Sequence, residues 1–506
     1  MMKESYDVVI VGGGGSGLAT GVSAAQNGAS VMLLEKCPEL GGTTGIAIGS
    51  FTANRTALQR KEGIEDDPDD HEADAGLFGR VDIQSRNNSQ MRRFFLGHSA
   101  ETLDWLTDMG LRFHGPSPEP PNRVPRMHNV VPNAKAYIAA LQSRLIVLGG
   151  TIICNARAEG LIKEGDRIVG VRSRINGRTI TFRARRGVVL AAGDYSNAPA
   201  IISRYKGARF SGIEGINPYC SGDGHLMAEQ VGAELLNMDV TYGPEIRFVP
   251  PARKPFSQLL PGSGLMARLM GSFLPLVPRP FINAMIKRLL VTWQHPEDRL
   301  FEDGAILINT RSERFCNEKA SPEREIRISE QPGKICYILL DQRLAKKYST
   351  WPHFVSTAPE IAYAYVKDYR RIRPDITMVQ ENLKGLAEIR GLPVEPLQKT
   401  VANYNRYVSG RGGDPFGRTG DSDPLVDGHW WLIGPAKAYF TTTEGGVGIN
   451  ESFQVLHTNG RPVEGLYAVG ANGMGGMILW GHGLHIAWAI TSGRMVGRLL
   501  AGKRTA

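Results

Sequence analysis

Apolar runs alternate with glycine-rich turns at the start of the chain, and this alternation predicts a strand, a tight turn, a helix and a second strand. Val8 to Val11 is a short continuous apolar run, as expected for a buried parallel strand. The next apolar run, SVMLLEK, ends at Glu35, and two later runs in RRGVVLAAGDYS and RPVEGLYAVGANG have the same character. The pattern predicts an α/β fold of the Rossmann type.

The turn after the first strand carries a G-x-G-x-x-G spacing at Gly12, Gly14 and Gly17. The first glycine permits the turn, the second lets backbone approach a pyrophosphate, and the third lets the helix pack on the strand. The helix N-terminus, at Gly15 and Ser16, supplies N–H groups for phosphates. Glu35 lies where an acidic side chain accepts ribose hydroxyls and disfavours a 2′-phosphate, so the spacing predicts FAD or NAD.

The segment CPELGGTTGIAIGS, directly after the acidic strand, favours FAD. Its second glycine pair, Gly41 and Gly42, is followed by the hydroxyl groups of Thr43 and Thr44. Such a loop suits contact with the ribityl chain and the flavin.

Composition sets broad limits. A chain of 506 residues is expected to form two or more domains, and 42% hydrophobic with 22% charged residues is ordinary for a globular protein. The five cysteines have no metal-ligand spacing, so the sequence predicts no metal and a reduced, cytoplasmic setting. We expect no signal peptide and no membrane span, because no 18-residue window is uninterruptedly apolar.

Most of the net charge of +9 is concentrated in one apolar segment, residues 251–293, which has six Lys or Arg residues and no acidic residue. Apolar anchors with cations are typical of an element that binds a membrane surface. The same composition suits a greasy substrate entrance, an elaborated cap or an oligomer interface. Nucleic-acid binding is not expected, because no aromatic–basic pattern is present.

Together these motifs resemble the fumarate reductase/succinate dehydrogenase flavoprotein family, which includes the 3-ketosteroid dehydrogenases. Further matching motifs are TLDWLTDMGLRF, CSGDGHLMAEQVGAELLNM, GAILINTRSERFCNE and TTTEGGVGINESFQVL, so the likeness covers nearly the whole chain. The resemblance implies a Rossmann-like FAD-binding domain built from residues 1–240 and 436–506. It also implies an inserted α+β capping domain at 241–435, where a helical run at 381–410 offers a buried face of Leu386, Leu392, Leu397, Val401 and Tyr404.

The resemblance also implies that residues 469–488 wrap the flavin and that a helix begins near Gly483 and Leu484. Its free N–H groups would stabilise negative charge on the reduced flavin. Non-covalent FAD is expected, because GGTTG offers threonines where the respiratory enzymes carry an attachment histidine. The predicted FAD contacts are Gly12, Gly14, Gly15, Ser16, Gly17, Glu35, Lys36, Gly42, Thr43, Thr44, Ala158, Ala192, Gly193, Asp194, Gly470, Ala471, Gly483 and Leu484.

Two departures from the family pattern concern the substrate. Trp480 stands where the dicarboxylate enzymes carry an arginine that clamps a carboxylate, and one of Thr441 to Thr443 replaces a histidine. Both changes argue against fumarate or succinate. An aromatic side chain at position 480 favours an apolar, ring-shaped substrate.

The resemblance supplies the candidate catalytic residues. Tyr439 falls where the ketosteroid enzymes have a tyrosine, and Tyr242 follows the strand that carries a substrate histidine in fumarate reductases. His482 is expected beside the flavin, where it donates to a carbonyl or takes part in proton transfer. Arg324 lies near the position of the proton-donating arginine of fumarate reductases, with a surface arginine as the alternative. The histidines at 485 and 128 are expected to be structural or without a role.

The sequence therefore predicts an FAD-dependent oxidoreductase that dehydrogenates a C–C bond next to a carbonyl in an apolar, 3-ketosteroid-like substrate. The alternative is an enone or enoate reductase with an external electron donor, which Arg324 would favour. A flavin-dependent hydroxylase and a non-catalytic flavin-binding membrane protein are further alternatives. An external electron acceptor or donor is expected, because no haem, iron–sulfur or FMN-attachment motif is present.

Overall fold

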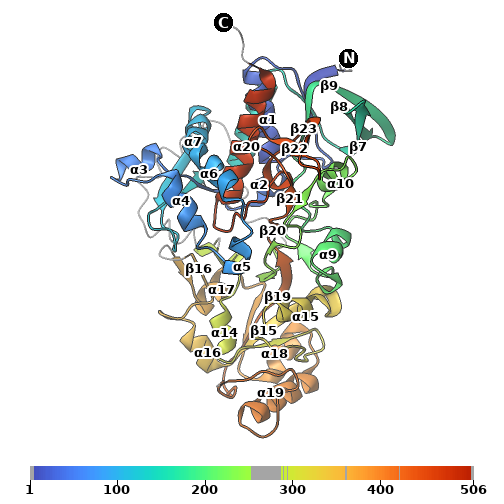
Figure 1. The fold of residues 1–506 in the computed structure, drawn as a ribbon. Helices are drawn as coiled ribbons and strands as arrows, with labels where there is room; N and C mark the ends of the chain where they lie inside the picture. Colours follow the sequence, from blue (N-terminus) through green and yellow to red (C-terminus); the bar gives the residue numbers. More distant parts are fainter. Residues whose placement is uncertain are drawn as a thin grey trace.

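The computed structural model describes residues 5–251, 287–288, 290–292, 294–358, 362–420 and 422–502. Their buried apolar side chains form two hydrophobic cores. One core combines residues from the two ends of the chain, and the other is built mainly from the middle of the chain. In Figure 1 the blue and red ends of the chain lie together at the top, and the yellow and orange middle lies at the bottom.

The first core surrounds an eight-stranded sheet with strand order β22-β23-β9-β1-β2-β6, extended from β9 by β8 and β7. Its strands are β1 (Ser5–Val11), β2 (Val31–Leu34), β6 (Thr151–Ile153), β7 (Ala156–Glu164), β8 (Arg167–Ile175), β9 (Arg178–Leu190), β22 (Gln454–Leu456) and β23 (Pro462–Ala468). In β1, Val9 pairs in parallel with Met32 on one side and Val188 on the other. The predicted buried parallel strands are therefore present. Strands from both ends of the chain, β1 and β23, belong to the same sheet.

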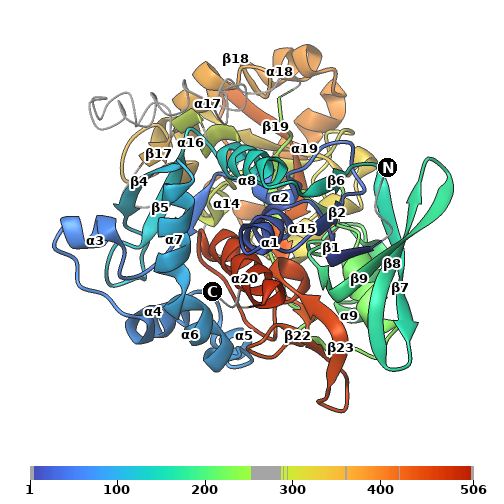
Figure 2. The same cartoon turned by 90° about the horizontal axis from the view of Figure 1, so that it is seen from above.

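Two helices from opposite chain ends pack against each other over this sheet. Helix α1 (Gly15–Gln26) contacts α20 (Leu484–Ala501) closely, and α8 (Lys135–Val147) lies on the other side of α1 (Figure 2). The approach needs glycine, because a Cβ at Gly493 would lie 2.2 Å from the carbonyl oxygen of Ser16. Since α20 begins at Leu484 after Gly483, the helix start has the predicted position.

A mainly helical region lies between β2 and β6. It contains α2 (Gly42–Ile46), α3 (Ala57–Lys61), α4 (Pro68–Ala75), α5 (Val81–Gln84), α6 (Ser89–Gly97) and α7 (Ser99–Asp108). It also contains a three-stranded sheet of β3 (Ser50–Thr52), β4 (Arg112–Ser117) and β5 (Met127–Val131). The loop between β4 and β5 becomes important at the functional site.

The second core surrounds a six-stranded sheet centred on β19 (Trp430–Phe440). The other strands are β10 (Glu214–Gly215), β13 (Glu245–Phe248), β14 (Ile306–Ile308), β15 (Cys336–Leu340) and β18 (Thr377–Gln380). The surrounding helices are α14 (Asp298–Glu302), α15 (Glu323–Ser329), α16 (Gln342–Lys347), α17 (Val366–Ile372), α18 (Leu383–Arg390) and α19 (Val394–Val408), and β16 (Ser356–Ala358) pairs with β17 (Ala362–Ala364).

The remaining elements are short. They are α9 (Pro199–Tyr205), α10 (Asp223–Glu229), β11 (Leu235–Leu236), β12 (Thr241–Tyr242), β20 (Thr442–Thr443), β21 (Gly446–Val447) and the 3₁₀ turns η1 (Ala208–Phe210), η3 (Pro332–Lys334) and η4 (Gly470–Asn472). Strand β12 pairs with β20, which brings Tyr242 beside Thr442.

The helical run expected at 381–410 is two helices rather than one. Gly391 ends α18 in the left-handed conformation, and Pro393 precedes α19. The predicted apolar face is nevertheless buried, with exposed fractions from 0% to 7% at its five residues. The domain boundaries at 240 and 435 stay a prediction; side chains at Tyr195, Ile201 and Ile213 already join the second core.

Most of the basic apolar segment 251–293 lies outside the described residues, and so does the membrane-surface prediction that rests on it. Of its described part, Leu290 and Val291 are buried in the second core, and Lys287 forms an ion pair with Asp368 at 3.0 Å. Among the residues that the structure describes, no helix has the length and apolar character needed to cross a bilayer.

Candidate active site

The glycine-rich turn after β1 forms the first part of a cradle. A Cβ at Gly17 would lie 1.9 Å from the carbonyl oxygen of Gly12, so glycine is needed for the helix to pack on the turn. At Gly14, in contrast, the nearest protein atoms would be 3.9 Å from a Cβ, which leaves the backbone open to a ligand. Gly15 and Ser16 follow at the N-terminus of α1, as the sequence predicts.

Glu35 and Lys36 lie at the end of β2 beside this turn. The carboxylate of Glu35 accepts hydrogen bonds from the backbone N–H groups of Gly13 (2.7 Å) and Cys37 (2.8 Å). Lys36 forms an ion pair with Asp223 at 2.8 Å. Ala158, on β7, is buried in the same region.

The second glycine pair lies against the first turn. Gly14 forms an isolated parallel bridge with Gly41, and Gly42 begins α2 with a positive φ of 51°. Thr43 accepts a hydrogen bond from Asn217 at 3.0 Å, and the side chain of Thr44 packs against Gly15. The two loops, predicted as contacts of one ligand, are therefore neighbours.

The remaining predicted contacts of the cradle follow two strands: Ala192, Gly193 and Asp194 come after β9, and Gly470 and Ala471 come after β23. Asp194 accepts hydrogen bonds from Ser196 (2.8 Å) and from the hydroxyl of Thr442 (3.0 Å). Asn472, which follows Gly470 and Ala471, is fully buried, and its Oδ1 accepts from the Ala192 N–H at 3.3 Å. Its Nδ2 has no protein partner. A buried amide donor without a partner is costly unless a ligand or water accepts from it.

Gly483 precedes α20 in the left-handed conformation, and the first N–H groups of α20, at Leu484 and beyond, have no intrahelical acceptor. The parts of the cradle all offer hydrogen-bond donors or open backbone to a ligand. They are the backbone N–H groups at two helix starts, the open glycine backbone, and the buried amide of Asn472. These residues fit FAD, because they offer a phosphate site at α1, a ribose acceptor at Glu35 and donors for the flavin edge at α20.

Beside the start of α20 lies a cavity of about 380 Å³, called the aromatic cavity below. Its aromatic walls are Phe78, Tyr242 and Trp480, and its remaining lining comes from Gly79, Glu119, Pro120, Thr241, Gly243, Glu245, Gly481 and His482. The rings of Tyr242 and Trp480 meet edge to face at 6.3 Å. Gly79 lies against the Trp480 indole, where a Cβ would approach within 1.7 Å of the ring.

His482 and Glu119 form the main polar pair of the aromatic cavity. Oε1 of Glu119 lies 2.5 Å from Nδ1 of His482 and accepts the His482 backbone N–H at 2.7 Å. Burial alone would lower the pKa of His482, but the hydrogen bond and charge of Glu119 outweigh it and raise the pKa. The imidazole therefore holds its second proton to a higher pH than a free histidine does.

A second charged pair stands on the other wall. Arg247 donates from Nη2 to Oε2 of Glu245 at 2.7 Å and to the hydroxyl of Thr441 at 3.0 Å. Burial would raise the pKa of Glu245, but the charges of Arg247 and the nearby histidines lower it. Burial raises the pKa of the Tyr242 phenol, so Tyr242 stays protonated at neutral pH.

Comparison with known proteins decides the family. The profile of the FAD binding domain family matches residues 7–481. The chain belongs to this family. The predicted FAD cofactor and the predicted mixed α/β fold are thereby confirmed, while the individual FAD contacts stay a prediction.

The chain is also similar to individual flavoproteins. NADH:fumarate oxidoreductase of Klebsiella pneumoniae is 25% identical over 475 residues, which cover 92% of this chain and 44% of that relative. The chain thus spans less than half the length of that relative. The open conformation of a flavocytochrome c3 fumarate reductase matches with a TM-score of 0.72 at 23% identity, over 99% of this chain and 78% of that one.

A 3-ketosteroid Δ4-(5α)-dehydrogenase from Rhodococcus jostii RHA1 matches with a TM-score of 0.58 at 22% identity, over 99% of this chain and 98% of that one. The predicted resemblance to fumarate reductase flavoproteins and to ketosteroid dehydrogenases is confirmed at the level of the fold.

The structure brings three of the five predicted catalytic residues of this flavoprotein together. Tyr242, Trp480 and His482 all line the aromatic cavity. Tyr439 lies opposite Glu245 in the β13–β19 pairing and so on the same sheet face, but it is not among the residues that line the cavity. Burial, with the charge of Glu214, raises the pKa of Tyr439 to about 12.

Arg324 lies elsewhere, inside the second core. Its guanidinium contacts Glu325 at 2.6 Å and Asp298 at 2.8 Å, donates to the carbonyl of Glu318, and stacks over the ring of Phe301 at 4.8 Å. Its side chain is 6% exposed, so it is neither a surface arginine nor part of the aromatic cavity. Its predicted role as proton donor has no support from this placement.

Sequence reasoning missed the carboxylates of the site. Glu119 and Glu245 line the aromatic cavity, and Glu444 accepts from the Leu479 N–H (2.8 Å) and pairs with His485 at 2.9 Å. His128 is fully buried and contacts Thr56. Glu119 lies in the proline-rich loop between β4 and β5. No local pattern could indicate its place in the cavity, because its partner, His482, is 363 residues away.

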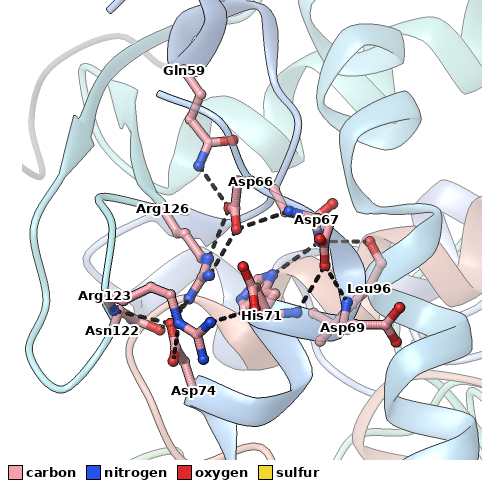
Figure 3. Close-up of polar contacts among 12 residues, drawn as sticks. Gln59, Asp66, Asp67, Asp69, His71, Asp74, Leu96, Asn122, Arg123 and Arg126 are labelled. Atoms are coloured by element: carbon pink, nitrogen blue, oxygen red, sulfur yellow. Dashed lines mark hydrogen bonds and ion pairs between the residues drawn. The ribbon is translucent and has the colours of Figure 1, made fainter. Parts of the chain in front are cut away.

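A buried ion network holds the loop that carries Glu119. Figure 3 shows Arg126 directed at Asp66 and Asp74, with distances of 2.7 and 2.5 Å, and all three side chains are at most 2% exposed. Asn122 accepts from Arg126 at 3.0 Å, and the Asn122 N–H bonds the carbonyl of Glu119 at 3.0 Å. The network therefore fixes the loop backbone next to the aromatic cavity.

Proposed function

We propose that the protein is an FAD-dependent oxidoreductase that reduces a C=C bond conjugated to a carbonyl group in an apolar, ring-containing small molecule. The observation that carries the proposal is the His482–Glu119 pair, which places a proton donor in a cavity beside the FAD cradle. Bound FAD, once reduced by a separate electron donor, supplies the hydride.

The walls of the aromatic cavity support the substrate class. Phe78, Tyr242 and Trp480 offer apolar faces, and no Lys or Arg stands among the described residues that line the cavity. A volume of about 380 Å³ suits a small molecule of one or a few rings. A flat, uncharged ring therefore fits the cavity better than a dicarboxylate.

The protonation states support the direction. Glu119 raises the pKa of His482 and so favours its protonated form, and burial raises the pKa of Tyr242, which keeps its phenolic proton. Reduction adds a hydride to the β-carbon and a proton to the α-carbon of the conjugated bond. His482 is assigned as the proton donor, and Tyr242 donates a hydrogen bond to the substrate carbonyl, which draws charge away from the double bond.

The similarity to NADH:fumarate oxidoreductase supports reduction and a separate source of electrons for this chain. The opposite direction, dehydrogenation of a 3-ketosteroid-like substrate, is the second candidate. It is favoured by Glu245, an ionised carboxylate in the same cavity, which could accept the α-proton.

The test is a substrate panel under anaerobic conditions. Reduced methyl viologen serves as the donor, and the panel contains neutral cyclic and aryl enones, unsaturated carboxylates and 3-ketosteroids. We expect turnover of neutral enones and a loss of about 10²–10⁴-fold in kcat when His482 is replaced by glutamine, the usual contribution of a general acid. No enone turnover, with bleaching of oxidised flavin by a saturated 3-ketosteroid, would favour the second candidate.

A further inference from the structure

An arginine stands directly behind one wall of the aromatic cavity, bound to a carboxylate of that wall. Arg247 and Glu245 have side chains that are 15% and 18% exposed, and their 2.7 Å contact is a charge-assisted hydrogen bond. Glu245 lines the cavity. The guanidinium is therefore in direct contact with a carboxylate that lines the cavity.

The backbone fixes this arrangement. Glu245 and Arg247 are two residues apart on β13, so their side chains leave the same face of the strand. Strand β13 pairs antiparallel with β19, with Glu245 opposite Tyr439 and Arg247 opposite Lys437. Because the sheet holds Arg247, a change at Glu245 leaves the scaffold of the guanidinium in place.

The other charges of the cavity largely cancel. Glu119 is bound to His482, so their opposite charges compensate each other inside the cavity. Tyr242, Thr241 and the remaining aromatic walls are neutral. Among the described residues, what a charged substrate meets is therefore decided mainly by Glu245 and its partners, Arg247 and His295, whose Nδ1 lies 3.7 Å from Oε1 of Glu245.

We propose that Glu245 is the specificity-determining residue of this cavity, because its negative charge repels a substrate carboxylate and compensates the positive charge of Arg247. The inference rests on the proposed function, since it concerns the substrate of the same site. An anionic substrate meets the like charge of Glu245 and is rejected, whereas a neutral enone is not. Without the charge of Glu245, the positive charge of Arg247 is no longer compensated and favours an anionic substrate, so the accepted substrates extend from enones to enoates.

Two probes with the same ring and the same double bond test this idea. Cinnamate carries a carboxylate where 4-phenyl-3-buten-2-one carries a methyl ketone. We expect the native protein to prefer the ketone by about 100-fold in kcat/KM, since a like charge costs about two powers of ten. Glu245→Gln should lower this preference by about tenfold or more, because the like charge is gone and the uncompensated charge of Arg247 attracts cinnamate.

Two variants serve as controls. Adding Arg247→Met to Glu245→Gln should remove the gained cinnamate activity, because the guanidinium is gone. Glu119→Gln also deletes a cavity carboxylate, but it has a histidine rather than an arginine behind it. It should slow both probes and leave their ratio close to that of the native protein.

Binding is measured separately from turnover, by the change that each probe produces in the flavin absorbance. If the native protein binds both probes equally well, the inference is overturned without any variant. An unchanged ratio in Glu245→Gln also overturns it, while continued ketone reduction leaves the proposed function standing. If neither probe is reduced but Glu245→Gln gains cinnamate binding that needs Arg247, the inference holds and the proposed function fails.

Discussion

Replacing Glu119 with glutamine is expected to lower the pH at which proton donation by His482 fails. Glutamine keeps the shape of the side chain and removes its charge. In the native protein Glu119 outweighs burial and raises the pKa of His482, so the variant loses the raising contribution and keeps the lowering one. The acid form of His482 then disappears at a lower pH.

The size of the shift follows from the contact. A hydrogen bond to a charged group contributes about 1.5–3 kcal/mol. The His482 side chain is 47% exposed toward the cavity, so solvent screening brings the value to the low end of this range. Since one unit of pKa corresponds to about 1.4 kcal/mol, the expected decrease is about one unit.

The assay is the single-turnover reoxidation of reduced flavin by a neutral enone, followed across the pH range. The native rate should be constant at low pH and fall as the pH passes the raised pKa of His482, and in Glu119→Gln the fall should come about one pH unit earlier. His482→Gln, the control, should lack this pH step. An identical midpoint in the native protein and Glu119→Gln would refute the assignment of Glu119 and His482.

Stability should follow the same linkage. The folded-state pKa of His482 is raised, so its contribution to the free energy of unfolding is fully present below the unfolded value of about 6.5. It is lost as the pH rises through the folded-state pKa. The difference in thermal stability between the native protein and Glu119→Gln should therefore be larger in mildly acid than in alkaline buffer.

Three further changes test other parts of the structure. Gly14→Val should fold yet lose FAD, as flavin content and circular dichroism would show. Gly17→Ala should instead lower the melting temperature, because its Cβ would lie 1.9 Å from the carbonyl oxygen of Gly12. Tyr242→Phe should reduce kcat by about 10-fold or more and Tyr439→Phe by far less, because only Tyr242 lines the cavity; equal losses would restore Tyr439 as a catalytic candidate. Arg126→Met removes the arginine partner of buried Asp66 and leaves Asp74 paired with Arg123 alone, so it should lower the free energy of unfolding by about 3–5 kcal/mol in urea titration.

The FAD cradle could be predicted from the sequence because its geometry is local. The spacing of Gly12, Gly14 and Gly17 fixes a turn and a helix start, and Glu35 follows at the end of the next strand. The start of α20 at Leu484 was predicted from the resemblance to the flavoprotein family, and the structure has it there. Such features depend on neighbours in sequence.

The aromatic cavity could be predicted only in part, because the residues that line it are far apart in the sequence. Glu119 reaches His482 across 363 residues, and no local pattern records this contact. Arg324 matched a motif spacing, yet its surroundings are set by how α14 and α15 pack in the second core. The helical run at 381–410 and its buried apolar face were predictable from the spacing of the apolar residues, and Gly391 and Pro393 divide the run into α18 and α19.

The most direct test of the proposed reduction is one anaerobic mixing experiment. Chemically reduced, FAD-loaded protein is mixed with one equivalent of 4-phenyl-3-buten-2-one, and flavin absorbance and product are recorded together. The proposed function predicts that oxidised flavin returns with an equal amount of saturated ketone, and that His482→Gln slows this step by about 10²-fold or more. Two results together would contradict the proposal and establish a dehydrogenase. The reduced flavin would stay reduced when the enone is added, and the flavin of the oxidised protein would be bleached by a saturated 3-ketosteroid.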